Sequence, residues 1–229
     1  MTPTAASGHD EDRGGSTLLR TGPLEIRALS VGPMDNNAYL LTCRSTGAQL
    51  LIDAAAEPER LQALIAEGSP AGRLDLIVTT HRHHDHVGAL AALVEASGAR
   101  TAAGAEDAAA LPVPTDRPLA HGEVIELGDQ RLEVIALRGH TPGSIALLWH
   151  DDAQGPEAGH HLFTGDSLFP GGVGNTDRDP QRFAQLLGDV EERVFDRLPD
   201  ATAVHPGHGA GTTLDAERPA LPGWRERGW

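Results

Sequence analysis

The chain has 229 residues and a formal net charge of −15, from 33 acidic residues against 18 basic ones. Such an excess of negative charge repels phosphate backbones, so a long nucleic acid is not expected as a partner. All of the basic residues are arginines, which excludes mechanisms that need a lysine, among them Schiff-base chemistry and the Walker phosphate loop.

No apolar run approaches the roughly 18 residues that a membrane helix needs. The start of the chain carries acidic residues and lacks the apolar region of a secretory signal. The single cysteine, Cys43, excludes an internal disulfide and a cysteine-rich metal module, and it is expected in the core. We therefore expect a cytoplasmic protein that binds neither nucleic acid nor membrane.

The first half of the chain alternates between strand and helix patterns. Residues 1–22 are small, polar and acidic, which favours a loose tail, and we expect 23–229 to form a single domain. Short β-rich runs and two amphipathic stretches follow. They predict strands at 24–31, 37–43, 48–53 and 74–80, and helices at 57–68 and 87–98.

The second half repeats this alternation, and no linker separates the two halves. Patterns there predict strands at 131–139, 144–150, 161–165 and 202–209, and a helix at 180–198. The stretch 101–122 is ambiguous, 151–160 resembles a hairpin loop, and the C-terminal stretch from Leu214 is expected to be partly helical at best. Interleaved strands and helices in two similar halves predict a layered α/β or α+β fold.

The most informative segment is the histidine-rich run that follows the buried strand at 74–80. It reads His81-Arg82-His83-His84-Asp85-His86, and a helix is expected directly after it. His81 and His83 alternate and can face one point, while Asp85 and His86 can face a second point nearby. Imidazole nitrogen and carboxylate oxygen suit zinc or iron. A merely solvated histidine-rich loop is the alternative, and the apolar segments on both sides argue against it.

This run resembles the HxHxDH signature of the metallo-β-lactamase superfamily. Three later segments resemble the remaining motifs of that family, in the same order: GHTPGS at 139–144, FTGDSLF at 163–169 and PGHG at 206–209. The resemblance extends from about Asn36 to His208. It implies a four-layer αββα sandwich with metal ions at one edge of its two sheets.

The resemblance also implies a ligand set for two divalent metal ions. The ligands would be His81, His83 and His140 for the first ion, Asp85, His86 and His208 for the second, and Asp166 as the bridge between them. Zn²⁺ is the expected metal, with Fe or Mn as alternatives, because the same donor atoms accept all three. True β-lactamases of the commonest zinc subclasses have cysteine where this chain has Asp166. An aspartate there resembles the glyoxalase II, lactonase, phosphodiesterase and sulfur-dioxygenase branches.

The implied chemistry is hydrolysis by water. Two dications carry a charge of +4, of which the catalytic carboxylates Asp85 and Asp166 cancel half. The surplus lowers the pKa of a bridging water, so that a metal-bound hydroxide is the expected nucleophile. The run Gly165–Leu168 also spells the GDSL motif of serine esterases. Its position in the middle of the chain argues against a serine nucleophile.

The expected substrate is a hydroxyacyl thioester, as in glyoxalase II. The loop after Asp166 resembles the loop that lies near the thiol carrier in that branch, so Gly172, Asn175 and Arg178 are candidate substrate contacts. The chain has few basic residues there and ends 21 residues after His208. These features favour a thiol less anionic than glutathione, such as mycothiol. The alternatives are an iron-dependent persulfide dioxygenase, a lactonase or phosphodiesterase, and a metal-binding protein without activity.

The remaining histidines are expected to have lesser roles. His84 is expected to face solvent. His205 is expected either to orient a ligand imidazole or to pack in the core. We expect the other four outside the N-terminal tail at the surface: His121, His150, His160 and His161.

Overall fold

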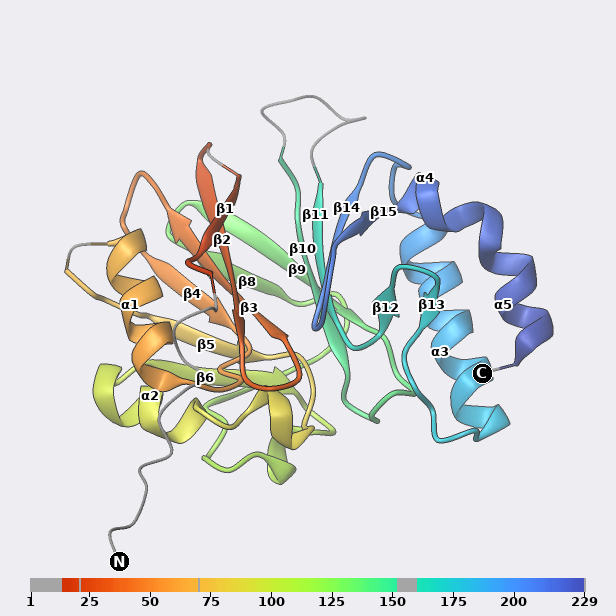
Figure 1. Cartoon of the computed structure of the whole chain (residues 1–229), viewed down its shortest axis with the longest axis horizontal. Coiled ribbons are helices and arrows are strands. Elements are labelled where there is room, and N and C mark those ends of the chain that lie inside the picture. Colours follow the sequence, from red (N-terminus) through yellow and green to blue (C-terminus); the bar gives the residue numbers. More distant parts are fainter. Residues whose placement is uncertain (1–13, 21, 70, 152–159, 229) are drawn as a thin grey trace, which may run out of the picture.

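Two β-sheets pack face to face and helices cover their outer faces (Figure 1). The computed structural model describes residues 14–20, 22–69, 71–151 and 160–228. On one side lie α1 (Pro58–Gly68) and α2 (Leu90–Ser97), and on the other lie α3 (Pro180–Val190) and α5 (Leu221–Arg227). This order of layers confirms the four-layer αββα sandwich.

The first sheet has seven strands in chain order. Its first four strands pair antiparallel, and the strands that follow pair parallel. Parallel strands are buried on both faces, which explains the uninterrupted apolar sequence of β5. The strands are β1 (Thr17–Arg20), β2 (Leu24–Val31), β3 (Asn36–Cys43), β4 (Gln49–Ile52), β5 (Leu76–Thr79), β6 (Arg100–Gly104) and β7 (Arg117–Leu119).

The second sheet has six strands in the order β15-β14-β11-β10-β9-β8. Its parallel pair β11 and β14 places the residues that follow these two strands side by side. The strands are β8 (Val124–Leu127), β9 (Gln130–Ala136), β10 (Ile145–Trp149), β11 (His161–Gly165), β14 (Ala203–Pro206) and β15 (Thr212–Thr213). A separate hairpin joins β12 (Leu168–Phe169) to β13 (Gly172–Val173).

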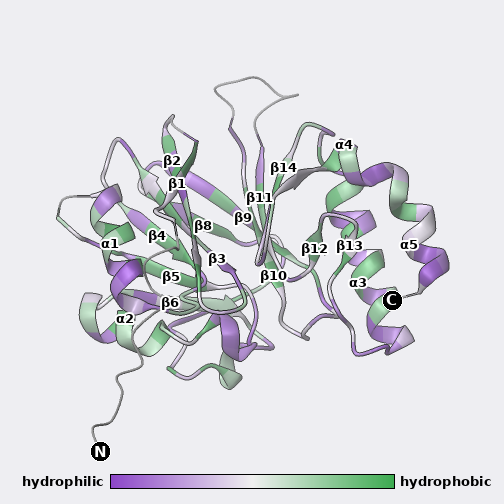
Figure 2. Ribbon diagram, in the orientation of Figure 1, coloured by the Kyte–Doolittle hydropathy of each residue, from purple (hydrophilic) through white to green (hydrophobic). Residues whose placement is uncertain are grey.

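Three apolar cores hold the layers together. The central core lies between the sheets and includes Leu41, Val78, Leu147 and Phe163. An outer core lies under α1 and α2, and another lies under α3 and α5. Figure 2 shows the inner strands mostly in green and much of the helical surface in purple.

Several segments differ from the sequence expectation. Thr17–Arg20 lies within the stretch expected to be loose, yet it pairs with β2 as an edge strand. Residues 1–13 of that stretch lie outside the described residues. The ambiguous stretch after 101 contributes to β6 and contains β7. These short strands carry too few residues to show a period, and their pairing depends on the rest of the sheet.

The C-terminal segment is more helical than expected. It forms α4 (Leu214–Glu217), a 3₁₀ turn (Arg218–Ala220) and α5, whose Trp224 is buried in the outer core with residues of α3. The helix predicted at 180–198 consists of α3 and a π-helical segment at Glu191–Phe195. The loop expected at 151–160 lies mostly outside the described residues. No helix in the described part of the chain is long and apolar enough to cross a membrane.

Candidate metal centre

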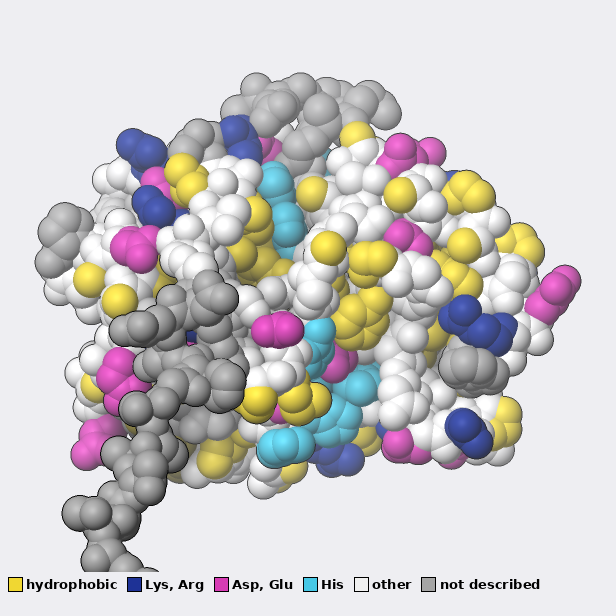
Figure 3. Space-filling view, in the orientation of Figure 1, with side chains coloured by type: hydrophobic (Ala, Val, Ile, Leu, Met, Phe, Trp, Pro, Cys, Tyr) yellow, Lys and Arg dark blue, Asp and Glu magenta, His cyan; other side chains and the backbone are white. Residues whose placement is uncertain are grey.

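The strand ends at one edge of the sandwich carry the residues of the centre. The histidine-rich run follows β5 and includes a short 3₁₀ turn, His84–His86. His140 follows β9, Asp166 follows β11 and His208 follows β14. Figure 3 shows histidine side chains gathered at the lower centre of the face in view. Segments far apart in the sequence therefore meet at one point of the surface.

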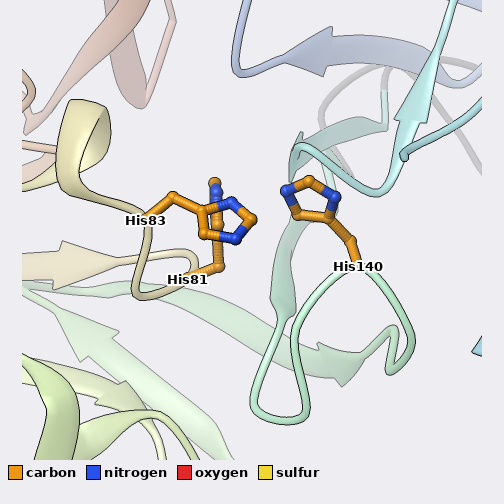
Figure 4. A group of neighbouring side chains, drawn as sticks. All are labelled: His81, His83 and His140. Atoms are coloured by element: carbon orange, nitrogen blue, oxygen red, sulfur yellow. The ribbon is translucent and has the colours of Figure 1, made fainter. Parts of the chain in front are cut away.

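The first group of donors consists of His81, His83 and His140. One nitrogen from each ring lies within 4.8 Å of the others. His81 and His83 come from one loop and His140 faces them from the opposite loop (Figure 4). The Nε2 atoms of His81 and His140 are buried, and neither has a hydrogen-bond partner within the described residues. Buried polar atoms without partners are costly, which points to a missing ligand.

The second group consists of Asp85, His86 and His208. The Nε2 atoms of His86 and His208 lie 3.2 Å apart. Asp85 Oδ2 lies 3.5 Å from His86 Nε2 and 3.3 Å from His208 Nε2. Three donor atoms this close together form a cage for one small cation.

Asp166 lies between the two groups. Its Oδ1 is 3.3 Å from His86 Nε2, and its Oδ2 is 3.7 Å from His140 Nε2 and 3.5 Å from His208 Nε2. Its carboxylate thus faces both groups, as a bridging carboxylate must.

Hydrogen bonds at Nδ1 orient the imidazoles of the candidate ligands. His140 Nδ1 donates to the carbonyl of Asn175 at 2.8 Å, and His208 Nδ1 donates to the carbonyl of Met34 at 2.9 Å. His86 Nδ1 donates to Asp53 Oδ2 at 2.9 Å. An imidazole that donates from Nδ1 has its Nε2 lone pair available for a metal.

Asp53 is a residue of this centre that the sequence analysis did not identify. Besides His86, it accepts hydrogen bonds from the backbone N–H and the hydroxyl of Thr80, at 2.7 and 2.8 Å. The Thr80 hydroxyl lies 3.1 Å from His81 Nδ1. Asp53 is buried and has a positive φ of 58°. An acidic residue directly after the apolar run of β4 was the available signal.

Local charge and burial shift the pKa values of these groups. Burial and the neighbouring imidazole of His86 hold the pKa of His81 well below its usual range. Burial alone would lower the pKa of His86, but Asp53 and Asp166 raise it to about 10. Burial alone would raise the pKa of Asp166, but hydrogen bonds with His208 and His86 hold it below its usual range. A cation bound by the second group would therefore have to displace a proton from His86.

Two glycines leave the room that the centre needs. A Cβ on Gly207 would lie 2.3 Å from Asp166 Oδ1 and 2.8 Å from the Cε1 atom of His86. A Cβ on Gly174 would lie 1.8 Å from the carbonyl oxygen of Asp166. Any larger residue at these positions would displace the bridging carboxylate.

The candidate substrate residues lie at different distances from the centre. Asn175 borders it directly, because its carbonyl holds His140. Arg178 is exposed nearby, and it and Asp177 both have positive φ. Gly172 lies in the β12–β13 hairpin, where a Cβ would contact the guanidinium of Arg227.

Most of the other histidines lie away from the centre. His205 is buried, and its Nε2 pairs with His161 Nδ1 at 2.9 Å. It also stacks on Phe163, which supports the core interpretation and not the orientation of a ligand imidazole. His160 and His161 are buried, so their predicted surface location is wrong. The side chain of His84 is 92% exposed, as expected.

The serine of the GDSL run is not placed for catalysis. The side chain of Ser167 is buried, and its hydroxyl contacts the carbonyl of Leu137 at 3.4 Å. The metal-binding interpretation of this segment fits the geometry better. Imidazole nitrogens and carboxylate oxygens in two adjacent groups fit two divalent cations of the zinc, iron or manganese type.

This fold and this set of strand-end motifs agree with a family model. Residues 31–208 match the model of the metallo-beta-lactamase superfamily. The chain belongs to this superfamily.

Several proteins similar to this chain have the name hydroxyacylglutathione hydrolase. The chain is 35% identical over 195 residues to a hydroxyacylglutathione hydrolase of Cereibacter sphaeroides, covering 82% of this chain and 70% of that one. It spans 59% to 62% of the length of three further relatives with this name.

Two solved structures are similar over most of their length. One is TTHA1623 in a di-iron-bound form, with 36% identity and a TM-score of 0.67, covering 83% of this chain and 96% of that one. The other is ETHE1 from Myxococcus xanthus, with 27% identity and a TM-score of 0.73, covering 88% of this chain and 84% of that one.

Proposed function

We propose that this protein is a hydrolase that uses two divalent metal ions and cleaves a hydroxyacyl thioester. The observation that carries the proposal is the pair of adjacent donor groups with Asp166 between them. In this proposal His81, His83 and His140 hold the first ion, Asp85, His86 and His208 hold the second, and Asp166 bridges. Zn²⁺ is the expected metal. The similarity to a di-iron protein keeps iron as the main alternative.

When bound, the ions would supply a nucleophilic hydroxide at neutral pH and polarise the carbonyl oxygen of the substrate. The protein would orient the imidazoles that hold the ions and supply negative charge next to the ions. Asp53 and the carbonyls of Asn175 and Met34 hold the ligand imidazoles by Nδ1. Asp85 and Asp166 offset part of the positive charge. No protein nucleophile takes part in this proposal.

The charged residues at the rim of the centre support the proposal that the thiol carrier has little negative charge. The guanidinium of Arg182 donates hydrogen bonds to the carboxylate of Asp177 at 2.6 Å and to the carbonyls of Gly139 and His140 at 2.8 and 2.6 Å. The side chain of Asp177 is 70% exposed beside His140. A carboxylate of glutathione that approached here would be repelled by the exposed carboxylate of Asp177, while Arg178 is the exposed cation next to it in the chain. A less anionic carrier such as mycothiol therefore fits better.

The test compares two thioesters with the metal-loaded protein. We expect faster release of thiol from lactoyl-mycothiol than from lactoyl-glutathione. The variant Asp177→Asn should improve kcat/KM for the glutathione thioester, while Asp196→Asn, an exposed acid after the π-helical segment, should not. A preference of the parent for the glutathione thioester would refute the carrier assignment and leave hydrolysis standing.

An iron-dependent persulfide dioxygenase is a second candidate, and the similarity to ETHE1 fits it. In this alternative one iron is held by His81, His83, His140 and Asp166. Oxygen consumption with a persulfide, together with no cleavage of either thioester, would decide for it. The fully built second donor group favours the hydrolase.

A further inference from the structure

Asn36 is a buried polar residue at the start of β3, next to the second donor group. It is 2% exposed, and its backbone forms an isolated antiparallel bridge with His208. The next residue, Asn37, donates its backbone N–H to the carbonyl of Gly207 at 2.7 Å. These contacts fix the backbone of Asn36 against the loop that carries His208. From this position the amide nitrogen of its side chain reaches the second donor group.

The amide nitrogen of Asn36 touches all three donors of the second group. Nδ2 donates to Asp85 Oδ2 at 2.9 Å and lies 3.4 Å from the Nε2 atoms of both His86 and His208. Zinc-type cations bind imidazole nitrogen and carboxylate oxygen at about 2.0 to 2.2 Å. The three donors are only 3.2 to 3.5 Å apart, so a cation that they held would have the Asn36 amide as its neighbour.

The two ends of an amide respond oppositely to a cation. The N–H end is favourable while it donates to the Asp85 carboxylate, and it would become unfavourable if a dication took the lone pairs of the surrounding donors. A half-turn about the last side-chain bond exchanges the N–H end for the carbonyl oxygen, and this torsion is soft. In the structure, before any such half-turn, the side-chain oxygen of Asn36 faces Gly32. It lies 3.7 Å from the position that a Cβ of Gly32 would have, so the glycine leaves room there.

We propose that Asn36 is a further oxygen donor to the second metal ion. This inference rests on the metal centre of the proposed function and deepens it. The two sites then differ in character. The first has three imidazoles and one carboxylate, and the second has two imidazoles, two carboxylates and an amide oxygen. Oxygen-rich sites with more ligands favour Mn²⁺ or Fe²⁺ over Zn²⁺, so the second site should discriminate less against these ions than the first.

The test is calorimetric titration of the full-length, metal-stripped protein with Zn²⁺ and with Mn²⁺. In Asn36→Ala the second dissociation constant should rise by about 10- to 100-fold, the range known for residues that support a metal site, with a larger rise for Mn²⁺. Asn36→Asp supplies an oxygen and should restore binding. The first dissociation constant should not change in either variant.

A control variant separates this role from general destabilisation. Gln49 is another fully buried amide of the same sheet, bonded to Thr42 and to the carbonyl of Ile65 away from the centre. Gln49→Ala should lower the stability and leave both dissociation constants unchanged. With Co²⁺ as the probe, the visible absorption of the second equivalent should gain intensity in Asn36→Ala, because the coordination number falls.

Three results would overturn the inference. The first is a second dissociation constant that is unchanged or lower in Asn36→Ala. The second is failure of Asn36→Asp to restore binding, which would mean that Asn36 acts only by donating to Asp85. The third is binding of a single ion by the parent, which would also remove the proposed dinuclear centre. A parent that binds two ions with this Asn36 dependence but cleaves no thioester would refute only the proposed substrate.

Discussion

At the scale of single residues, the centre depends on hydrogen bonds that fix the ligand imidazoles. Asp53 is the most connected of the supporting groups, because it holds His86 directly and His81 through the Thr80 hydroxyl. Asp53 itself lies outside the four motifs that indicate the ligands. Only the folded chain brings it next to them.

We expect Asp53→Asn to weaken metal binding by about 10- to 100-fold, because an amide accepts less strongly than a carboxylate from His86 and Thr80. Metal titration of the variant measures this. Asp116→Asn is the matched control, since Asp116 likewise accepts from the backbone N–H and hydroxyl of one threonine, Thr101, away from the centre. Equal metal affinities in the two variants would contradict the role of Asp53.

A second residue-scale prediction concerns the buried pair of His161 and His205. Burial lowers the pKa of His205 to about 3 and that of His161 to about 4. In the unfolded chain each titrates near 6.5. Between these values the unfolded state binds more protons, so stability falls as the pH drops below about 6.5.

His205→Gln keeps a polar partner for His161 and removes one of the two titrations. The loss of stability between pH 7.5 and pH 5 should then be about 2 kcal/mol smaller than in the parent. Urea unfolding in the presence of a chelator measures this without metal release. His84→Gln changes an exposed imidazole and should keep the parental pH dependence. An unchanged pH dependence in His205→Gln would show that the pKa of this histidine is the same in the folded and unfolded states, which would contradict the lowered value.

At the scale of elements, the tight approach of the PGHG loop to the strand ends makes glycine necessary. Gly207→Ala should displace Asp166 or His86 and abolish binding of at least one metal ion, because the new Cβ would lie within 3 Å of both. Gly188→Ala is the control. Gly188 is in α3 with open space around it, so alanine there should raise stability by about 0.5 to 1 kcal/mol.

Metal content and thermal unfolding of the two glycine variants provide the comparison. If Gly207→Ala binds two ions as the parent does, the loop has more freedom than the structure shows.

The sequence predicts long periodic elements better than short ones. The periodicity of 180–198 predicts an inward apolar face that includes Phe183, Leu186 and Val190, and these residues of α3 are buried. The pattern of 87–98 predicts a stripe that includes Leu90 and Ala91. The structure buries Leu90, but it exposes Ala91 and buries Leu93 instead. Strands of two to four residues such as β12 and β13 have no readable period, since they exist only through their pairing with each other.

At the scale of the whole molecule, the two sheets each contribute part of the centre. The loop after β5 belongs to the first sheet, and the loops after β9, β11 and β14 belong to the second. The resemblance implied the proposed ligand set because these residues form compact motifs. Asn36 and Asp53 lie outside those motifs, on β3 and at the end of β4, and reach the centre only through the packing of the sandwich. The position of an acidic residue directly after β4 was the one sequence signal for Asp53, and it does not by itself indicate a role at the centre.

The most direct test of the central claim measures metal content and thioester cleavage together. The parent should bind two metal ions per chain and release thiol from a lactoyl thioester. Asp85→Ala should retain the first ion, bind the second weakly and lose at least about 100-fold in kcat, because its carboxylate is a donor of the second cage. A parent that binds two ions and releases no thiol, or an Asp85→Ala variant that cleaves the thioester at the parental rate, would contradict the account.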